Sequence, residues 1–495
     1  MTLAPARLRL LVASLLTVSF LGALDHTVVS TSLASIAGSL GALEQMGWVV
    51  VSYTLAATVL LPILGKLGDL LGPRRVFLVS LALFLLASLA CGFAQDMTQL
   101  ILARVVQGVS SAGLQLMSQT IVATVTSPRE RPRLLSIVGA AFPVAILVGP
   151  LLGGIITDSL GWQWVFWLNI PFGVAALVFA LIAIPRLPST GLRGFDVPGA
   201  ITFPLALIAL VLAVTWAGDP ELRFATLVTA ILAAVGFAVF FALEARATEP
   251  IVHLGLFRNR TVAAGVALSA IIGIGLFSVV SYIPTYIQMA YRTNATVSGL
   301  VPIATVFGML VSSLATGWLA SRSGHYRVFT IVGTALASAG LLAMALLPPG
   351  LPLGVPMVAM AVVGIGTGSF MSLIVAVVQS SVPKTATGSV TALTNLVRQM
   401  GSTVGTAVIG GVIGVGVAAA LPPALDAATL TPQVAQQAGP ALQGEIAGIY
   451  ASVMSPVFLA LAAVYAVGIV AAVMLPAGRL SDETAGAPAP ETLAV

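Results

Sequence analysis

Long apolar segments alternate with short polar connections along almost the whole chain. Glycine, proline and charged residues divide the apolar segments into fourteen runs, several of which exceed the roughly 20 residues that a helix needs to cross a hydrocarbon layer. We therefore predict an all-α polytopic membrane protein. The fourteen expected transmembrane helices span residues 8–36, 46–68, 74–94, 98–122, 133–157, 163–185, 197–216, 223–243, 261–289, 297–320, 327–347, 354–380, 388–418 and 446–476.

Composition supports a membrane protein and excludes a water-soluble one. Charged residues make up 7% of the chain and hydrophobic residues 58%, whereas soluble domains carry about 25% charged residues. The first run, near Leu8, follows two arginines and has no cleavage pattern, so we interpret it as a retained helix and not as a signal peptide. The net charge of +5 is scattered between apolar runs, which suits lipid headgroups and disfavours nucleic acid.

Lysines and arginines are distributed unevenly between the two sides of the predicted helices. Seventeen of the 21 fall on the side of the N-terminus, whereas Arg223 and Arg292 fall on the other side and Arg104 and Arg398 lie within helices. Positive residues favour the cytoplasmic side of a membrane. We therefore expect both termini in the cytoplasm and a multi-pass protein of a bacterial cytoplasmic (inner) membrane.

The sequence lacks the patterns of most catalytic and metal sites. A single cysteine, Cys91, excludes an internal disulfide and a thiolate metal cluster. There is no zinc-ligand spacing, nucleophile elbow or phosphate-binding loop. We expect no enzyme, no metal and no cofactor, so that an ion gradient has to supply any energy that the protein uses.

A sequence repeat divides the chain into two halves. The segment GKLGDLLGPRR begins at Gly65, and GWLASRSGHYR begins at Gly317, 252 residues later, with glycine, leucine, glycine and arginine at the same offsets. Such a repeat is typical of transporters built from two bundles with the substrate site between them. We predict a six-helix bundle over 1–188, two inserted helices over 189–250, a second six-helix bundle over 251–480 and a disordered tail over 481–495.

Ionisable residues inside the predicted helices are few and therefore informative. Of the 16 acidic residues only Asp25 lies deep within a helix, and Arg104 lies at a similar depth. A carboxylate held by a movable arginine can carry a proton, although a static ion pair would place the same residues together. His26 is either a proton relay or passive. Arg398 either neutralises an anionic substrate group, reaches toward the helix end or contacts a backbone carbonyl.

Two glycine-rich motifs have both a functional and a structural interpretation. In the first, Gly65 and Gly68 allow close helix packing. Asp69 can pair with a facing basic group or cap a helix N-terminus in one conformation only, which would make a latch; a tight turn with Arg74 and Arg75 is the alternative. The second motif can kink a helix or simply pack it tightly. It consists of Gly149, Pro150, Gly153 and Gly154.

Four segments together resemble the major facilitator superfamily. They are GKLGDLLGPRRV (65–76), ILARVVQGVSSAG (101–113), LVGPLLGGIITD (147–158) and LDHTVVSTSL (24–33). The last is similar to the first-helix motif of the fourteen-span drug:proton antiporter branch, the QacA/EmrB-like proteins. Three positions depart from the family pattern: Ser30 replaces an asparagine, Gln163 an arginine and Ser321 the acid of the second signature loop, which suggests a weaker latch in the C-terminal half.

The resemblance implies export of small, mainly hydrophobic or amphipathic compounds in exchange for protons, by alternating access. The protein would act as a monomer among membrane lipids, with the 147–158 motif as a gate. A dedicated exporter of one endogenous metabolite or lipid, and a non-transporting sensor, are the alternatives. Candidate cavity residues are Trp48, Tyr53, Gln115, Phe142, Tyr282, Tyr286, Phe370, Met371, Asn395 and Arg398.

Overall fold

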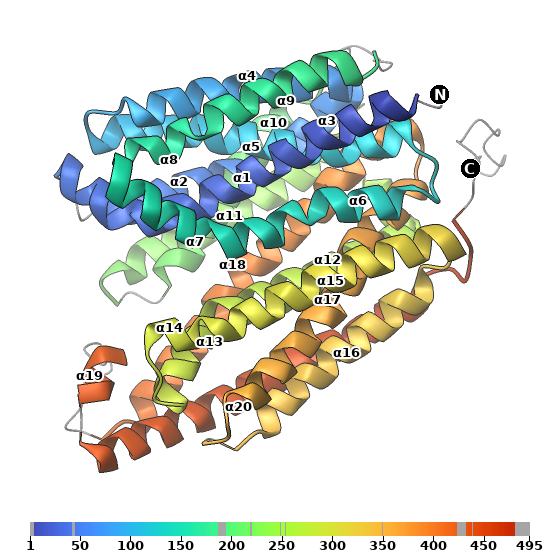
Figure 1. Ribbon diagram of the computed structural model, residues 1–495. Helices are drawn as coiled ribbons and strands as arrows, with labels where there is room; N and C mark the ends of the chain where they lie inside the picture. Colours follow the sequence, from blue (N-terminus) through green and yellow to red (C-terminus); the bar gives the residue numbers. More distant parts are fainter. Residues whose placement is uncertain are drawn as a thin grey trace.

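The backbone of this computed structural model is almost entirely helical (Figure 1). Within the residues that it describes, extended backbone pairs only at two isolated bridges, Phe195 with Glu249 and His325 with Arg479. The protein is all-α, as its hydropathy pattern predicts. The described residues are 4–41, 45–186, 195–217, 220–247, 249–252, 254–348, 350–422, 432–437 and 439–480.

The first half of the chain forms one group of helices, coloured blue to teal in Figure 1. Helix α1 packs along α7 and α9, and α4 packs along α5. The bounds are α1 (Pro5–Leu40), α2 (Met46–Val59), α3 (Leu61–Leu71), α4 (Pro73–Gly92), α5 (Met97–Val125), α6 (Arg131–Gly139), α7 (Ala141–Leu160), α8 (Gln163–Trp167) and α9 (Asn169–Ala183).

The second half forms a corresponding group, coloured yellow to red in Figure 1. Helix α17 packs between α15 and α16, and α20 packs on α16 and α12. The bounds are η3 (Leu254–Arg258), α12 (Arg260–Ile272), η4 (Gly273–Phe277), α13 (Ser278–Ala290), α14 (Ala295–Ser298), α15 (Leu300–Ser323), α16 (Arg327–Leu346), α17 (Gly354–Ser380), η5 (Lys384–Ala386), α18 (Thr387–Ala420), α19 (Pro432–Gln437) and α20 (Pro440–Met474).

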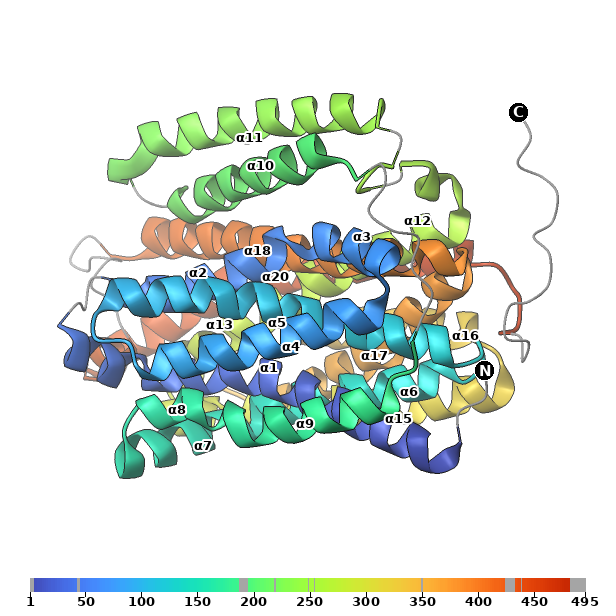
Figure 2. The ribbon, with the colours of Figure 1, turned by 90° about the horizontal axis from the view of Figure 1, so that it is seen from above.

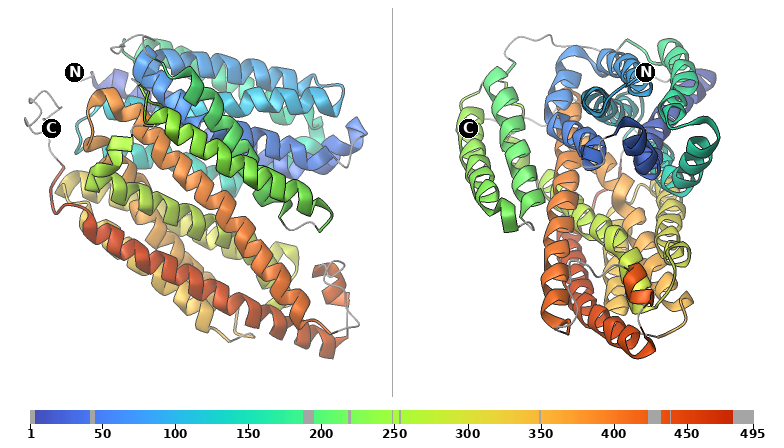
Figure 3. Two further views of the ribbon diagram at one scale, coloured as in Figure 1. Left: turned by 180° about the vertical axis from the view of Figure 1, so that it is seen from behind. Right: turned by 90° about the vertical axis from the view of Figure 1, so that its left-hand side faces the viewer.

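Two helices between the groups form a separate hairpin. Helix α10 (Val197–Trp216), the short turn η2 (Pro220–Leu222) and α11 (Arg223–Glu244) lie outside the main body, with α10 nearer to it (Figures 2 and 3). The main contact of α10 is with α11, and it also touches α2 and α18. Large apolar side chains on α11 point away from the protein, as lipid-facing residues do, and Phe224 is 78% exposed.

The helices are compatible with fourteen membrane crossings. Among the described residues, thirteen are long and apolar enough to cross alone, and the pair α2 and α3 passes the same test together with a bend of 46°. Pro62 lies in the first turn of α3 and has no backbone N–H to continue the ladder from α2, which accounts for the break. A second irregularity is the π-helical turn η4, where Gly273 lies against the backbone of Arg398 on α18.

One connection was predicted incorrectly. The gap between the expected helices 388–418 and 446–476 predicts a loop from about 419 to 446, but α18 continues to Ala420, α19 forms a short helix and α20 begins at Pro440. Alanine and glutamine favour helix, and Pro432 and Pro440 each occupy a position where a helix tolerates proline. Residues 423–431 and the predicted tail 481–495 lie outside the described residues.

Both ends of the described chain lie at one end of the helix bundle. The start of α1 and the segment that follows α20 are on the same side in Figure 1, and we call this side the terminal face. The short helix α19 lies at the opposite end. A backbone bridge between His325 and Arg479 joins the final segment to the turn before α16. This arrangement agrees with an even number of crossings.

Labelling of cysteines tests which face is cytoplasmic. Val434 of α19 is 48% exposed, so Val434→Cys should react with an impermeant thiol reagent added to intact cells. Arg75→Cys, an exposed position on the terminal face, should react only after permeabilisation. The native Cys91 is fully buried and should not compete. Labelling in the reverse pattern would show that the predicted orientation is wrong.

Candidate functional site

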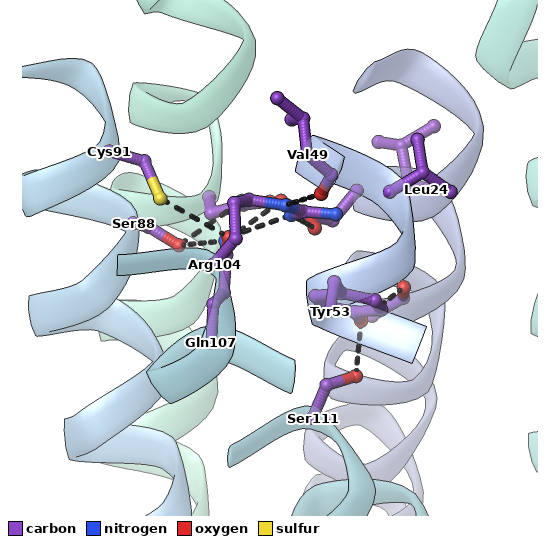
Figure 4. A network of polar contacts seen from close by, with 12 residues as sticks. Leu24, Val49, Tyr53, Ser88, Cys91, Arg104, Gln107 and Ser111 are labelled. Atoms are coloured by element: carbon purple, nitrogen blue, oxygen red, sulfur yellow. Dashed lines mark hydrogen bonds and ion pairs between the residues drawn. The ribbon is translucent and has the colours of Figure 1, made fainter. Parts of the chain in front are cut away.

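The carboxylate of Asp25 lies in the middle of α1 and is completely buried. Nη1 of Arg104 on α5 lies 2.5 Å from Asp25 Oδ2, and neither side chain is exposed. A charge of either sign at this depth is costly unless it is paired. The two residues that the sequence singled out as deep charges therefore form one ion pair, whose surroundings Figure 4 shows.

Neutral amides hold the second oxygen of the carboxylate. Gln107 Nε2 donates to Asp25 Oδ1 at 2.8 Å, and Asn169 Nδ2 from α9 donates to the same atom at 3.0 Å. Both amides also reach Ser88 Oγ on α4, at 2.8 and 3.3 Å. Four helices thus contribute to one polar cluster, and each Asp25 oxygen has a donor, as a buried polar group requires.

Arg104 also contacts a backbone carbonyl and an aromatic ring. Its Nε donates to the carbonyl oxygen of Val49 at 3.1 Å, and its guanidinium carbon lies 4.1 Å from the centre of the Tyr53 ring. Such a position over an aromatic face stabilises a cation. The Tyr53 hydroxyl in turn donates to Ser111 Oγ at 2.6 Å. Nη2 of Arg104 has no hydrogen-bond partner among the described residues, so its N–H groups are available to another acceptor.

Sequence reasoning missed the amides and the serine of this cluster. Gln107 lies three residues after Arg104, and this spacing puts both on one helix face. Asn169 is a single polar residue in an apolar run, which is the only signal that the sequence gives for it. His26 lies beside the cluster: its ring lies 6.1 Å from that of Tyr53, and among the described residues no hydrogen bond joins it to Asp25. Its role as relay or passive residue stays a prediction.

The predicted latch joins the two helix groups at the terminal face. Asp69, near the end of α3, accepts hydrogen bonds from the backbone N–H groups of Gly388 at 2.7 Å and Ser389 at 2.8 Å. The Ser389 hydroxyl also donates to it at 2.6 Å. These donors belong to the first turn of α18, where N–H groups lack partners within the helix and the helix dipole favours an anion.

The other residues of this motif divide between two tasks. A Cβ at Gly65 would lie 2.9 Å from the carbonyl oxygen of Gly388, so only glycine permits the contact between α3 and α18. Gly68 faces the Met117 side chain within its own group. Arg74 also stays within its group, where its Nη2 donates to a carbonyl of α9 at 3.1 Å, and Arg75 is exposed.

The second copy of the motif makes a contact of opposite polarity. Ser321 stands where the first copy has Asp69, and its carbonyl oxygen accepts from Arg129 Nε at 3.0 Å. The carbonyl of Arg322 accepts from Arg129 Nη2 at 2.8 Å. These carbonyls end α15, where the helix dipole favours a cation. In the copy of the motif that lacks the acid, an arginine from the other helix group thus binds the C-terminal end of α15.

The glycines of the 147–158 motif pack α7 closely against α1. Gly149 lies against the Thr27 side chain, and a Cβ at Gly153 would lie 2.9 Å from the carbonyl oxygen of Val28. Pro150 is exposed on the other side of the helix, and nothing lies within 4 Å of a Cβ at Gly154. The close packing is a structural fact, whereas the role of the motif as a gate stays a prediction.

A polar chain connects the two groups near their shared interface. Arg398 Nη2 donates to Asn395 Oδ1 at 2.5 Å, and Asn395 Nδ2 donates to Gln119 Oε1 on α5 at 2.9 Å. Gln379 Nε2 from α17 donates to the Gln119 backbone carbonyl at 3.3 Å. Gln115, which the sequence predicts as a cavity residue, lies one turn away from Gln119 and is exposed. Gln119 was not among the predicted residues.

The remaining candidate cavity residues have different surroundings. Tyr286 is 3% exposed and Phe370 is fully buried, and both lie in the hydrophobic core. Phe142 faces across the groups, with its ring 6.1 Å from that of Phe277. The Tyr282 hydroxyl donates to a carbonyl of α18 at 2.9 Å. Met371 is half-buried and packs against the core, and Trp48 is 43% exposed.

Comparisons with known proteins agree with this architecture. The family model described as Major Facilitator Superfamily matches residues 15–406. An uncharacterized MFS-type transporter of Mycobacterium tuberculosis is 32% identical over 488 residues, which are 97% of this chain and 71% of that protein. The multidrug transporter protein MdtP of Bacillus subtilis is 32% identical over 82% of this chain and 75% of its own length.

A solved structure shares the fold. The human organic anion transporter MFSD10 superposes with a TM-score of 0.59 over 95% of this chain and all of its own, at 16% identity. At that identity the likeness concerns the arrangement of helices alone.

A double-mutant cycle tests the buried ion pair. Arg104→Met should lower the melting temperature strongly, because losing one partner of a buried pair costs about 3–5 kcal/mol. Adding Asp25→Asn should recover part of the loss, since no unpaired carboxylate then remains, with a coupling of roughly 0.5–3 kcal/mol. Arg398→Met is the control, and its effect should simply add to that of Asp25→Asn. Additive effects for Arg104→Met as well would contradict the pairing.

Proposed function

This chain belongs to the Major Facilitator Superfamily and is a transporter rather than an enzyme, and from this membership we propose that it exports small, mainly hydrophobic or amphipathic compounds in exchange for protons. The terminal face is then the cytoplasmic face, since the sequence predicts 17 of the 21 basic residues on the side of the N-terminus. The proton gradient is the energy source, no cofactor takes part, and the protein works as a monomer in a bacterial inner membrane.

The observation that carries the proposal is the environment of Asp25. One carboxylate oxygen binds the only arginine that contacts it among the described residues, while neutral amides hold the other. A proton on the carboxylate would cancel its attraction to Arg104 but leave an acceptor for both amides. The site can therefore exist in two protonation states without losing its whole hydrogen-bond network.

The latch supplies the conformational half of the mechanism. Asp69 binds the first turn of α18 only while α3 and α18 are in contact, so its three hydrogen bonds favour the state that is closed at the terminal face. Opening of this face to admit substrate has to break them. Protonation of Asp25 and substrate binding would favour opposite states, so that inward proton movement drives outward substrate movement.

The substrate class rests on two observations. The relative MdtP is named a multidrug transporter, and the candidates that are not fully buried include the aromatic and methionine side chains of Trp48, Phe142 and Met371, which suit varied apolar ligands. A dedicated exporter of one endogenous metabolite or lipid is the second candidate. Resistance to a panel of unrelated dyes and drugs on expression supports the first, and transport of one compound class alone supports the second.

Removal of the latch charge should shift the conformational balance. Asp69→Asn keeps one acceptor oxygen but loses the charge that binds the α18 N-terminus, so the closed state should lose about 1 kcal/mol, or roughly fivefold in population. Spin labels at Arg75 and Thr385, both exposed on the terminal face, would report a longer distance distribution. Arg74→Gln, in the same loop but bonded within its own group, should leave the distances unchanged. An unchanged distribution in Asp69→Asn would leave only the tight turn.

Replacement of Asp25 should separate binding from coupling. Asp25→Asn resembles the protonated residue permanently, so in proteoliposomes substrate should still exchange down its own gradient while uphill transport driven by a pH gradient stops. Retained exchange also shows that the variant is folded. If the variant still concentrates substrate against a gradient, Asp25 has a structural role and another group couples the proton.

A further inference from the structure

The inserted hairpin carries two buried carboxyl groups at its terminal-face end. Asp196 is the residue before α10, and Glu244 is the last residue of α11. Asp196 is 8% exposed and Glu244 is 3% exposed. Neither belongs to the ion pair of Asp25 or to the latch, and burial of two acids without a cation would be costly if both were charged.

Each carboxyl group has one bonded oxygen and one free oxygen. Asp196 Oδ1 accepts from the Gly199 backbone N–H at 2.9 Å and so caps α10. Glu244 Oε1 accepts from the Val252 backbone N–H. Asp196 Oδ2 and Glu244 Oε2 are both buried and have no hydrogen-bond donor. Buried polar atoms without a partner are rare, so these two require an explanation.

The two free oxygens face the same small space. A Cβ placed on Gly199 would collide with Asp196 Oδ2 and would also lie 3.0 Å from Glu244 Oε2. The two side chains are close enough for a hydrogen bond between them. An ionised carboxylate has no donor, so that bond can form only if one of the two groups carries a proton. Paired carboxyl groups that share one proton are known from other sites.

No described cation neutralises this pair. The titratable group that acts on Glu244 is Asp196, and the other groups near it are backbone N–H donors of 251 and 252. Lys66 forms an ion pair with Glu249, at 2.5 Å. No described arginine or lysine donates to either free oxygen.

We propose that Asp196 and Glu244 bind one proton between them, as a protonation site on the inserted hairpin that is separate from Asp25. The ligand is a proton and not a metal ion, because two free oxygens are fewer than a hard cation requires. The described residues contain no group of three potential metal ligands.

The shared proton stabilises the contact between the segment that leads into the hairpin and the segment that leaves it. Phe195, next to Asp196, forms a backbone bridge with Glu249, whose carboxylate binds Lys66 of α3. Lys66 lies three residues before the latch residue Asp69 and is 3% exposed. Loss of the proton would put two negative charges in contact, and their repulsion would push these two segments apart. The site thereby links proton concentration at the terminal face to the position of Glu249 beside the latch.

Infrared spectroscopy of the purified full-length protein tests the shared proton directly. Wild type should show the carbonyl stretch of a protonated carboxyl group near neutral pH, and this band should disappear in Glu244→Gln and also in Asp196→Asn. Glu221→Gln, at the other end of α11, is the matched control and should leave the band unchanged. A spectrum that neither variant alters would overturn the proposal.

Thermal stability supplies a second, independent measurement. The folded protein holds the proton, so the melting temperature of wild type should fall as pH rises through the titration of the pair. Glu244→Gln supplies its own amide donor to Asp196 and should lack this fall. Asp196→Asn should behave likewise, because its amide donates to Glu244 Oε2. A fall of the wild-type size in both variants would contradict a shared proton.

The double variant distinguishes a shared proton from simple loss of charge. With amides at both Asp196 and Glu244, three contacts need an acceptor: the Gly199 N–H, the Val252 N–H and the contact between the two side chains. Two amides supply only two oxygens, so one donor faces another donor whichever way the amides are turned. It should therefore melt below both single variants, whereas relief of charge repulsion alone predicts the highest melting temperature of the set. Neither measurement depends on transport, so the result stands whether or not Asp25 couples protons.

Discussion

A charge inside a hydrocarbon layer has to be neutralised where it lies, and this requirement organises the N-terminal half of the protein. The ion pair of Asp25 and Arg104 fixes α1 against α5, where Gln107 is a second donor to the carboxylate, and the amide of Asn169 brings α9 into the same cluster. Tyr53 covers the guanidinium from α2. A polar site of this kind is stable only as a whole, because every buried donor and acceptor that loses its partner carries a desolvation cost. The proposed coupling therefore acts on a cluster and not on one residue.

Helix ends serve as charge partners elsewhere in the structure. Asp69 binds the N-terminus of α18, and Arg129 binds the carbonyls that end α15. Both contacts join one helix group to the other at the terminal face, and both depend on the repeated glycines, since Gly65 and Gly317 each allow a close approach of backbone from the opposite group. The two repeats thus solve the same problem with opposite signs of charge.

The inserted hairpin is more than a spacer between the groups. Its long faces are apolar and exposed, as a lipid-facing element requires, but its terminal-face end carries the carboxyl pair of Asp196 and Glu244. The bridge of Phe195 with Glu249 and the ion pair of Glu249 with Lys66 connect that end to α3. Together with Asp25, the proposed shared proton would give the molecule two places where protonation changes the balance of buried charge, one deep in the membrane and one at its surface.

The sequence by itself determined the properties that depend on distance along the chain. Apolar run length gave the helices, the uneven distribution of arginine and lysine predicted an orientation, and Asp25 and Arg104 stood out because charges are rare at such depth. The glycine motif likewise placed Asp69 at a helix end. These are one-dimensional properties, and packing between helices does not alter them.

Only the tertiary structure decided which side chains meet. Gln119 rather than Gln115 reaches the other helix group, and Tyr286 and Phe370 lie in the core, because helices apolar on every side give no period that shows which face points inward. Asn169, and the pairing of Asp196 with Glu244, depend on contacts between segments that are distant in the chain. Hydropathy shows whether a helix lies in lipid or in water, whereas packing determines how each helix is rotated and which helices are its neighbours.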